Sequence, residues 1–588
     1  MSDVPETIGD PPRMRWWGWG DPERAHQALS PHVLELLRET IGIPIDRSEI
    51  EYDLRSSSED LRSTSMPRPP VALGAVKLPR ARLSESARAS LQEIVGADGV
   101  RDDHAERVEH AAGKGYVDLV RMRAGTPEGA PDAVVLPRSH EQVRAVLEMC
   151  AASGLAVVPF GGGTSVVGGV EPLTGWHDAV IALDMRRIGG IAELDRESRI
   201  VTVGAGMRAP ELERRLAMEG LTLGHWPQSF EYVSLGGCVA SRSAGQASSG
   251  YGNIARMVLG LHMAAPAGDI ALQAIPASAA GPGLRELIVG SEGTLGVITA
   301  VSLRVRRAPA LRIYEGVMFE SFAAGINALR AMAQERALPD VARLSDAAET
   351  RMSMLLAGDG GLKGRLGRAY LGARGYGDRS KIGQRAQRCI AIVGFDGDSD
   401  ELKARRGRAL ALAHRNGGLM LGGSPGRAWL AGRFQAPYLR DELLTHGVMV
   451  ETLETATRWS NVQRLHGAVA GAIETALAEQ GTPGIVTCHV SHLYETGASL
   501  YYTFIARQRA GCEIEQWQAV KRAASEAIVC GGGTITHHHA VGRDHAPWLE
   551  REIGAEGMAA IRALKAELDP AGIMNPGKML FRQGERPA

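Results

Sequence analysis

The chain of 588 residues is longer than one hydrophobic core usually supports, which predicts two or three domains. Its 66 basic and 67 acidic residues give a formal net charge of −1, which argues against nucleic acid as the main partner. Hydrophobic residues make up 44% of the chain, as in an ordinary soluble globular protein, whereas its 72 glycines are an excess typical of tight turns and ligand-binding loops.

The first 127 residues are expected to form an extension that precedes the main fold. Residues 15–20 read RWWGWG, and three tryptophans so close together are uncommon. They predict either an aromatic plug that packs on another domain, or a cover over a ligand or a subunit interface. Residues 54–70 are rich in Ser, Arg and Pro, which is typical of a linker or a mobile loop.

From residue 131 the pattern becomes that of alternating strands and helices, which defines an expected domain over 128–309. A helix over 139–153 begins with Ser139 as its N-cap, and Gly220 follows a second helix in the C-cap position. Apolar runs and turn residues predict strands at 133–137, 156–159, 180–183, 200–203 and 297–306, and further helices at 210–219 and 283–289.

The sequence pattern of residues 310–530 predicts a second domain of mixed helix and strand. Long amphipathic helices at 322–337 and 461–479 alternate with strands such as 391–395 and 501–506. A final segment, 531–588, contains the polar cluster around His537 and a helix at 555–567. The fold class is therefore α+β.

Two glycine-dense stretches carry the clearest functional signal. Residues 159–169 read PFGGGTSVVGG, and residues 290–299 read GSEGTLGVIT. Glycine lets backbone N–H groups approach a ligand, and successive N–H groups form a concave anion site. Neither stretch matches the dinucleotide fingerprint G-x-G-x-x-G or the phosphate loop G-x-x-x-x-G-K-[ST]. The alternative is that both are only tight turns.

A third segment lies between the two glycine stretches. It contains HWPQS at 225–229, SLGG at 234–237, SRSAG at 241–245 and YGNI at 251–254. Small hydroxyl residues and glycines of this kind can lie against a flat ring and bond to its polar edge. The alternative is a surface loop.

In their order and spacing, these segments resemble the FAD-binding domain, of PCMH type, of the vanillyl-alcohol-oxidase flavoprotein superfamily. The resemblance implies a domain of two subdomains around FAD and a cap domain with an antiparallel sheet. No histidine occurs in 159–169, so we expect the FAD to be non-covalent. The residues that the resemblance assigns to FAD are Pro159, Phe160, Gly161, Gly162, Gly163, Thr164, Ser165, Val166, Gln228, Ser229, Ser234, Ser241, Arg242, Ser243, Ala244, Glu292, Gly293, Thr294, Leu295, Gly296, Val297 and Ile298.

The rest of the chain narrows the resemblance to the alkyldihydroxyacetonephosphate synthases. The motifs that carry it are RWWGWG at 15–20, VARLSD at 341–346, YLRD at 438–441, ETLETA at 451–456, GASLYY at 497–502 and THHHAVG at 536–542. Together they span about residues 12 to 580.

The resemblance implies a transferase of ether lipid synthesis. In that family the flavin N5 attacks C1 of acyl-dihydroxyacetone phosphate, a fatty acid leaves, and a long-chain alcohol takes its place. It assigns Arg440 to the substrate phosphate and Tyr501 to proton transfer, and Arg343 matches an essential arginine. A tyrosine needs a neighbouring cation to act as a base near neutral pH, and His537, His538 and His539 could supply that field or shuttle the proton.

The triple histidine has three interpretations: a polar wall of the active site, a metal site, or a purely structural role. If it lies on a strand, at most His537 and His539 share a face. His489 and His492 could form a further ligand pair, but a strand followed by a turn is the simpler interpretation. We expect no metal. Arg343 could instead form a supporting salt bridge.

Two further interpretations stay open. The tail IMNPGK at 573–578 resembles FAD-linked D-2-hydroxyacid dehydrogenases or oxidases, although their H-x-G-D-G-N-x-H segment is absent. Gln228 stands where eukaryotic synthases have an acid, and Phe160 replaces a small residue. A flavin-binding protein without catalysis would leave Arg440 and Tyr501 with no task.

The expected partners are a lipid-like phosphorylated substrate, a fatty alcohol and a second copy of the chain in a homodimer. The sequence shows no signal peptide, no peroxisomal signal and no apolar run of about 18 residues, so we expect a cytoplasmic protein, with peripheral membrane contact left open. The six cysteines form no Cys-x-x-Cys pair, and we expect free, buried thiols.

Overall fold

The computed structural model describes residues 13–23, 29, 31–43, 68–356 and 387–580. Most of the linker expected at 54–70 therefore lies outside the described residues. The N-terminal part contains helices α1 (Pro31–Ile41), α3 (Glu85–Val95), α4 (His104–Glu109) and α5 (Tyr116–Arg123).

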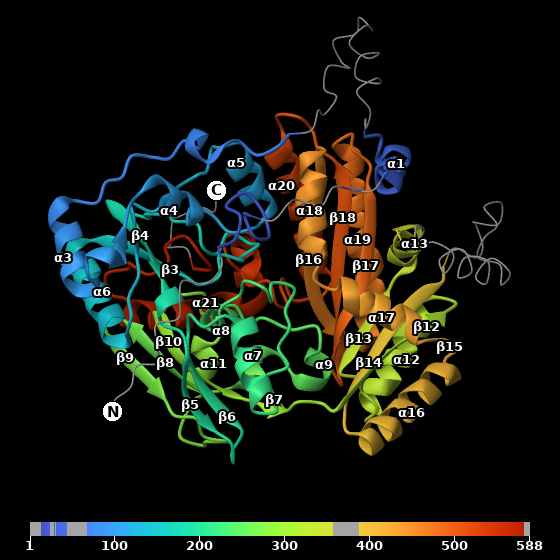
Figure 1. Ribbon diagram of the computed structural model, residues 1–588. Helices are drawn as coiled ribbons and strands as arrows, with labels where there is room; N and C mark the ends of the chain where they lie inside the picture. The colour runs from blue at the N-terminus through green and yellow to red at the C-terminus, as the bar shows by residue number, and fades with distance from the viewer. Residues whose placement is uncertain (1–12, 24–28, 30, 44–67, 357–386, 581–588) are drawn as a thin grey trace, which may run out of the picture.

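A four-stranded sheet comes first, in the order β1-β2-β4-β3. Figure 1 labels two of its strands, β3 and β4, on the side of the molecule where α3 and α6 lie. Its strands are β1 (Val100–Arg101), β2 (Ala133–Val135), β4 (Ala179–Asp184) and β3 (Leu155–Phe160). Helix α6 (His140–Ser153) packs on it with α3, and Ser139 caps α6 by accepting a hydrogen bond from the Gln142 amide. Strand β1 belongs to the region expected to be an extension, so this sheet begins earlier in the chain than its sequence pattern indicates.

The second sheet is antiparallel, with five strands in the order β5-β6-β10-β8-β9. Its strands are β5 (Ile191–Asp195), β6 (Ile200–Gly204), β10 (Val297–Arg304), β8 (Val258–Ala265) and β9 (Gly268–Leu272). A short pair, β7 (Leu221–Thr222) with β11 (Arg306–Arg307), lies apart from it. The helices of this part are α7 (Ala209–Met218), α8 (Leu235–Ala240), α9 (Ser248–Tyr251), α10 (Ile254–Met257) and α11 (Leu284–Ile288).

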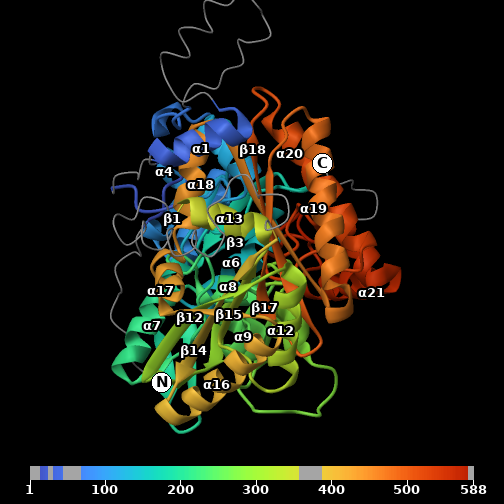
Figure 2. The same ribbon diagram turned by 90° about the vertical axis from the view of Figure 1, so that its right-hand side faces the viewer.

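The third sheet is the largest and is antiparallel throughout, in the order β15-β12-β14-β13-β17-β18-β16. Its strands are β12 (Leu311–Phe319), β13 (Val341–Ser345), β14 (Cys389–Gly397), β15 (Leu419–Gly422), β16 (Val448–Arg458), β17 (Ile485–Leu493) and β18 (Gly497–Arg507). One core joins it to α12 (Phe322–Gln334), α16 (Ser399–Arg415), α19 (Val462–Glu479) and α20 (Glu513–Cys530). Figure 2 shows α19 and α20 together on one side of this sheet. Three more helices, α13 (Ala347–Leu356), α17 (Gly423–Gly432) and α18 (Ala436–Thr445), complete this part.

The C-terminal segment crosses back to the first sheet. Helix α21 (Ala546–Leu568) breaks at Gly554, whose φ is 78°, so the helix expected at 555–567 is the part after the break. Beyond it, the Val157 amide donates to the Ile573 carbonyl at 2.8 Å, and the Asn575 amide donates to the Val157 carbonyl at 2.8 Å. Residues near the end of the chain thus run alongside β3.

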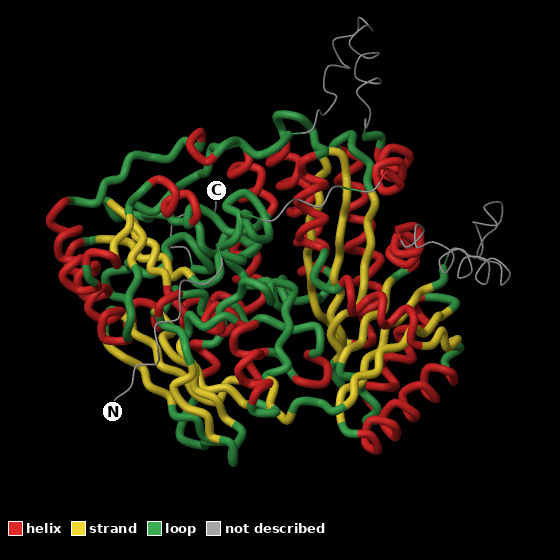
Figure 3. Tube along the Cα trace, in the orientation of Figure 1, coloured by secondary structure: helices red, strands yellow, loops and turns green. Residues whose placement is uncertain are grey.

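The expected α+β class is confirmed: helices cover antiparallel and mixed sheets, and loops gather between the two groups of strands (Figure 3). Four cysteines are buried as expected, but Cys512 is partly exposed and Cys530 is exposed, so for these two the expectation was wrong. Among the described residues, no helix combines the length and the apolar character that a membrane crossing requires.

Candidate active site

A cavity of about 520 Å³ lies where the glycine stretches face the seven-stranded sheet. Its volume is within the range of small-molecule and cofactor pockets. The sequence-predicted residues that line it are Pro159, Phe160, Gly161, Gly162, Gly163, Thr164, Ser165, Val166, Gln228, Ser229, Ser234, Ser241, Ser243, Ala244, Glu292, Gly293, Gly296, Val297, Ile298, Arg343, Arg440, Tyr501, His538 and His539.

Four other predicted residues do not line this cavity: Arg242, Thr294, Leu295 and His537. The Arg242 guanidinium donates to the carbonyls of Val289 and Glu286, both at 2.7 Å. The Thr294 hydroxyl donates to the Ser291 carbonyl at 2.7 Å, and Leu295 is buried in the core. Arg242, Thr294 and Leu295 therefore support the second glycine stretch without facing the cavity.

The first glycine stretch follows β3 directly and packs tightly on its surroundings. Gly163 has a φ of +65°, and a Cβ at this position would lie 2.7 Å from the ring of Phe160. Ser234 caps the start of α8 and faces Gly161 closely. A side chain at these glycines would displace the loop from the cavity wall.

The second glycine stretch is tied to the histidine segment by Glu292. Its buried carboxylate accepts hydrogen bonds from the amides of Val541 and Gly542, both at 2.7 Å. The Asn575 side chain donates to the Glu292 carbonyl at 2.7 Å. Burial raises the pKa of Glu292 to about 7, against the lowering effect of the two amides. One residue thus joins three distant segments at the cavity.

Unpaired polar atoms at the cavity fit a ligand with a polar, planar edge. The side-chain nitrogen of Gln228 and the side-chain oxygen of Gln246 are buried without a hydrogen-bond partner, and both residues line the cavity. Buried polar atoms normally have partners, so an amide donor and an amide acceptor here suit the polar edge of a flavin ring. Together with the glycine stretches they meet the requirements of FAD.

Strand β18 forms the opposite wall, and its side chains alternate between two environments. Tyr501, Thr503 and Ile505 line the cavity. Tyr502, Phe504 and Ala506 lie in the core behind the sheet. Burial raises the pKa of Tyr501 to about 12, against a smaller lowering effect of its hydrogen bond with Thr452. The nearby cation Arg343 also lowers the pKa of Tyr501, as expected of a neighbouring positive charge, but burial outweighs its effect.

The histidine segment is a loop and not a strand, which corrects the expectation that only His537 and His539 could share a face. The buried carboxylate of Glu454 holds this loop. It accepts hydrogen bonds from the amides of His537 at 2.5 Å, His538 at 2.9 Å and His539 at 2.9 Å, and from the Thr536 hydroxyl at 2.7 Å. The backbone amides of this loop thus donate to the Glu454 side chain, whereas in a strand they would donate to a neighbouring strand.

All three imidazoles are neutral at pH 7. Burial lowers the pKa of each of His537, His538 and His539 to about 4, against the opposing charge of Glu454. They therefore cannot supply the positive field that the sequence suggested. Although burial works against it, the three imidazoles in their protonated form and the His538 amide hold the pKa of Glu454 well below its usual range.

The side chains of His492, His537 and His538 come close to one another. One ligand nitrogen from each lies within 4.8 Å of the others. Several nitrogens are already hydrogen-bonded: His492 Nδ1 to the Ser248 hydroxyl at 2.5 Å, and His537 Nδ1 to His538 Nδ1 at 2.9 Å. A hydrogen-bonded cluster accounts for these contacts. His492 lies on β17, as does His489, in agreement with the simpler interpretation of this pair.

Arg343 reaches the cavity from β13 and is also ion-paired. Its guanidinium contacts Glu349 at 2.5 Å, and His489 Nδ1 contacts the same carboxylate oxygen at 3.0 Å. The other oxygen of Glu349 is buried without a partner. Arg343 thus both lines the cavity and forms the supporting salt bridge that was the alternative interpretation. Glu349 is a lining residue that sequence reasoning missed, and His489, considered from the sequence as one of a ligand pair, lines the cavity as well.

Arg440 lies on α18 at the same cavity, close to the N-terminal tryptophans. It donates to the Lys114 carbonyl at 2.8 Å and to the Asp441 carboxylate at 3.1 Å. The buried Lys114 ammonium donates to the carbonyls of Arg15 at 2.8 Å and Trp16 at 3.1 Å. Burial lowers the pKa of Lys114 to about 8. Lys114 was not predicted to belong to the site. Its position between two glycines, in the sequence GKG, was the signal that could have identified it.

The tryptophan segment is part of the site. Trp19 is buried, lines the cavity and meets Tyr232 edge-on with ring centroids 5.3 Å apart. Its backbone amide donates to the carboxylate of Asp441. Both features expected of this segment, a packed plug and a cover over a ligand pocket, therefore apply to Trp19.

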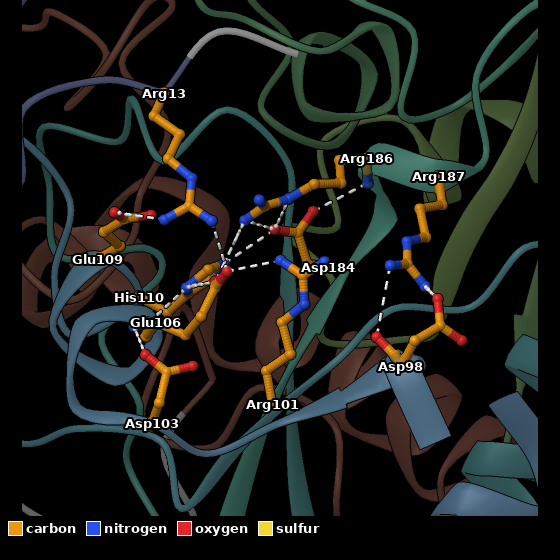
Figure 4. A network of polar contacts seen from close by, with 10 residues as sticks. All are labelled: Arg13, Asp98, Arg101, Asp103, Glu106, Glu109, His110, Asp184, Arg186 and Arg187. Atoms are coloured by element: carbon orange, nitrogen blue, oxygen red, sulfur yellow. Dashed lines mark hydrogen bonds and ion pairs between the residues drawn. The ribbon is translucent and has the colours of Figure 1, made fainter. Parts of the chain in front are cut away.

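A polar network anchors the start of the described chain beside the first glycine stretch (Figure 4). Arg13 contacts Glu106 at 2.8 Å and Glu109 at 2.9 Å. His110 contacts Asp184 at 2.8 Å, and its ring packs on Phe160 with centroids 4.4 Å apart. The network fixes the outer side of the glycine stretch.

One end of the cavity is apolar. The residues that form it come from α17, α18, β16 and β18, and they are Trp429, Ala436, Pro437, Leu439, Leu443, Val450 and Ile505. Arg440 and Arg343 line the same cavity. A ligand with an anionic group and a hydrocarbon chain therefore finds complementary surfaces for both.

Comparisons with known proteins agree with this geometry. A model of the FAD binding domain matches residues 131–271, and a model of the C-terminal domain of FAD linked oxidases matches residues 308–579. FAD is the cofactor that these matches and the cavity indicate.

Named relatives cover most of the chain. Alkyldihydroxyacetonephosphate synthase from Dictyostelium discoideum is 31% identical over 575 residues, which are 97% of this chain and 93% of the relative. The synthase from Trypanosoma brucei brucei is 33% identical over 495 residues, 83% of this chain and 80% of the relative. A solved alkyldihydroxyacetonephosphate synthase structure superposes with a TM-score of 0.80 at 27% identity, covering 96% of this chain and 98% of that one. The chain belongs to the alkyldihydroxyacetonephosphate synthase family.

Proposed function

We propose that this protein replaces the acyl chain of acyl-dihydroxyacetone phosphate by a long-chain alcohol, which yields an ether lipid precursor. The observation that carries the proposal is one cavity that joins glycine stretches fit for FAD, two arginines and an apolar end. Membership in the synthase family supports it. FAD, held by the two glycine stretches with Gln228 and Gln246, would supply the covalent chemistry through its nucleophilic N5 atom.

The arginines have separate tasks in this proposal. Arg440 binds the substrate phosphate, because a planar guanidinium can donate two parallel hydrogen bonds to phosphate oxygens. Arg343 stays paired with Glu349 and keeps a second positive charge at the cavity. The apolar end receives the hydrocarbon chain, since burying each CH₂ contributes about 0.8 kcal/mol.

Tyr501 acts on a proton at the substrate. Its raised pKa keeps the phenol protonated at neutral pH in the protein alone, so it begins the cycle as a donor. Its ring stacks on His538 with centroids 6.0 Å apart, and His539 meets it edge-on at 5.5 Å. The neutral imidazoles provide acceptors for the proton that Tyr501 handles.

The test uses the purified, FAD-loaded protein with two substrate sets. One set is acyl-dihydroxyacetone phosphate with a labelled long-chain alcohol, and the other is a panel of D-2-hydroxy acids with a dye acceptor. Label in an ether product and no dye reduction are the expected result. Dye reduction without label would reject the transferase and favour an FAD-linked dehydrogenase, a class that the match to FAD linked oxidases makes the natural alternative.

A further inference from the structure

A chain of hydrogen bonds leads from the cavity to Tyr494. His538 lines the cavity, and its Nδ1 lies 2.9 Å from Nδ1 of His537. The other nitrogen of His537, Nε2, lies 2.5 Å from the Tyr494 hydroxyl. Tyr494 is partly exposed and precedes the exposed Glu495. The two histidines and the tyrosine therefore connect the cavity with the protein surface.

We propose that His538, His537 and Tyr494 form a proton relay between the cavity and solvent. His537 does not line the cavity, but its two ring nitrogens contact His538 on one side and Tyr494 on the other. No sequence motif assigned a role to Tyr494. Both are positioning residues, because they act on the substrate only through His538.

The relay conserves protons at every step. In its first state, His538 donates from Nδ1 to His537 Nδ1, and His537 donates from Nε2 to the Tyr494 oxygen. When a proton arrives on His538 Nε2, the Nδ1 proton of His538 moves to His537 Nδ1 and the Nε2 proton of His537 moves to the Tyr494 oxygen. The original Tyr494 hydroxyl proton leaves to water. In the resulting state all hydrogen bonds point the other way. Flipping of the two imidazole rings and rotation of the Tyr494 hydroxyl then restore the first state, so that one proton has moved from the cavity to solvent in each cycle.

Charges around the relay favour this transfer. The carboxylate of Glu454 lies 3.6 Å from His538 Nδ1 and 4.0 Å from His537 Nδ1. A negative charge at this distance stabilises each imidazolium that forms transiently. Burial raises the pKa of Tyr494 to about 12, against the lowering effect of the Arg256 guanidinium, which lies 5.9 Å from the centroid of its ring, so Tyr494 passes its proton on only as it receives one from His537.

The inference rests on the proposed function, which creates the need for a relay. When an alcohol replaces a carboxylate on carbon, the alcohol loses its O–H proton and the acid leaves as an anion. One proton per turnover must therefore leave the site. Several side chains that line the cavity could accept this proton, and from His538 the hydrogen bonds continue through His537 to Tyr494.

The test measures solvent exchange of the imidazole N–H protons by NMR in FAD-loaded protein with ¹⁵N-labelled histidine. Signals of His537 and His538 are assigned with the variants His537→Gln and His538→Gln. Tyr494→Phe keeps the ring and removes the hydroxyl, and it should slow exchange at His538 on the order of tenfold. Its turnover should fall by a similar factor, with a larger solvent deuterium isotope effect than the unaltered protein.

Controls separate the relay from general damage and from the proposed function. Tyr314→Phe removes a buried hydroxyl 3.5 Å from Asp396, outside the cavity, and should leave exchange unchanged. His537→Gln should slow exchange at His538 even if Tyr494→Phe folds poorly. Tyr494-dependent exchange in a protein that makes no ether product would support the relay and reject the function. Exchange and isotope effect equal to those of the unaltered protein in both relay variants would overturn the relay.

Discussion

Tyr501 and Tyr502 are neighbours on β18, yet their side chains lie on opposite faces of the seven-stranded sheet. Tyr501 lines the cavity, whereas Tyr502 is fully buried in the core, and its hydroxyl lies 3.4 Å from the Leu465 carbonyl. The alternation of a β-strand thus provides a reactive tyrosine and a structural one in adjacent positions.

Replacing Tyr501 by Phe should lower turnover about 100-fold or more, because the hydroxyl that handles the proton is lost while the ring remains. FAD content, measured from the visible absorbance of the purified protein, should not change. Tyr502→Phe is the matched control: it should keep turnover and lose only about 1 kcal/mol of unfolding free energy. Normal turnover in Tyr501→Phe would remove Tyr501 from its proposed role.

Arg440→Ala should raise the KM for acyl-dihydroxyacetone phosphate on the order of tenfold, since charge-assisted hydrogen bonds to the phosphate are lost. The unphosphorylated acyl-dihydroxyacetone should be bound equally by variant and parent. Because Arg440 also contacts Asp441 and the Lys114 carbonyl, thermal unfolding should be followed in parallel. An equal loss of affinity for both compounds would indicate a disturbed fold instead of a lost phosphate contact.

Gly163→Ala should reduce FAD affinity, because its Cβ would meet Phe160 at 2.7 Å and push the first glycine stretch out of place. Gly154→Ala is a matched control, since Gly154 has a similar positive φ of +64° but no atom within 4 Å of the added Cβ. Both substitutions place a Cβ on a residue with positive φ, which lowers the free energy of unfolding by a similar amount, about 1 kcal/mol. Titration of FAD into the two apoproteins compares them, and identical affinities would show that the glycine stretch does not touch the cofactor.

The protein should lose stability as the pH falls from 6.5 towards 4. Burial depresses the folded-state pKa of His537, His538 and His539 from 6.5 to about 4, so in this window the unfolded chain binds more protons. Their contribution is fully present above pH 6.5, and each histidine adds about 1.4 kcal/mol per pH unit to the slope. Denaturant unfolding at several pH values should give a flatter slope for the double variant His537→Gln/His538→Gln. Parallel slopes would contradict this assignment.

Local signals predicted the local features well. Ser139 caps α6 and the glycine stretches line the cavity, because capping and close backbone approach depend on neighbouring residues. Long-range contacts were not predictable in this way. Glu454 lies 83 residues before His537, and only the folded structure reveals that it holds the histidines in a loop.

Electrostatics was the least predictable property. The number of histidines near Tyr501 suggested a positive field, but their burial makes them neutral, and burial is not encoded in spacing. Strand β1, with two residues, was missed for a related reason: its pairing with β2 depends on partners from a distant part of the chain.

The pairing of the C-terminal segment with β3 has a consequence for how the protein is made. Asn575 donates to the Gly169 carbonyl, 406 residues earlier in the chain. During synthesis, β3 lacks these partners until residues 573–575 have been made. We therefore expect a polypeptide that stops before residue 573 to bind FAD more weakly, because the Asn575 contacts with Gly169 and Glu292 in the two glycine stretches are missing.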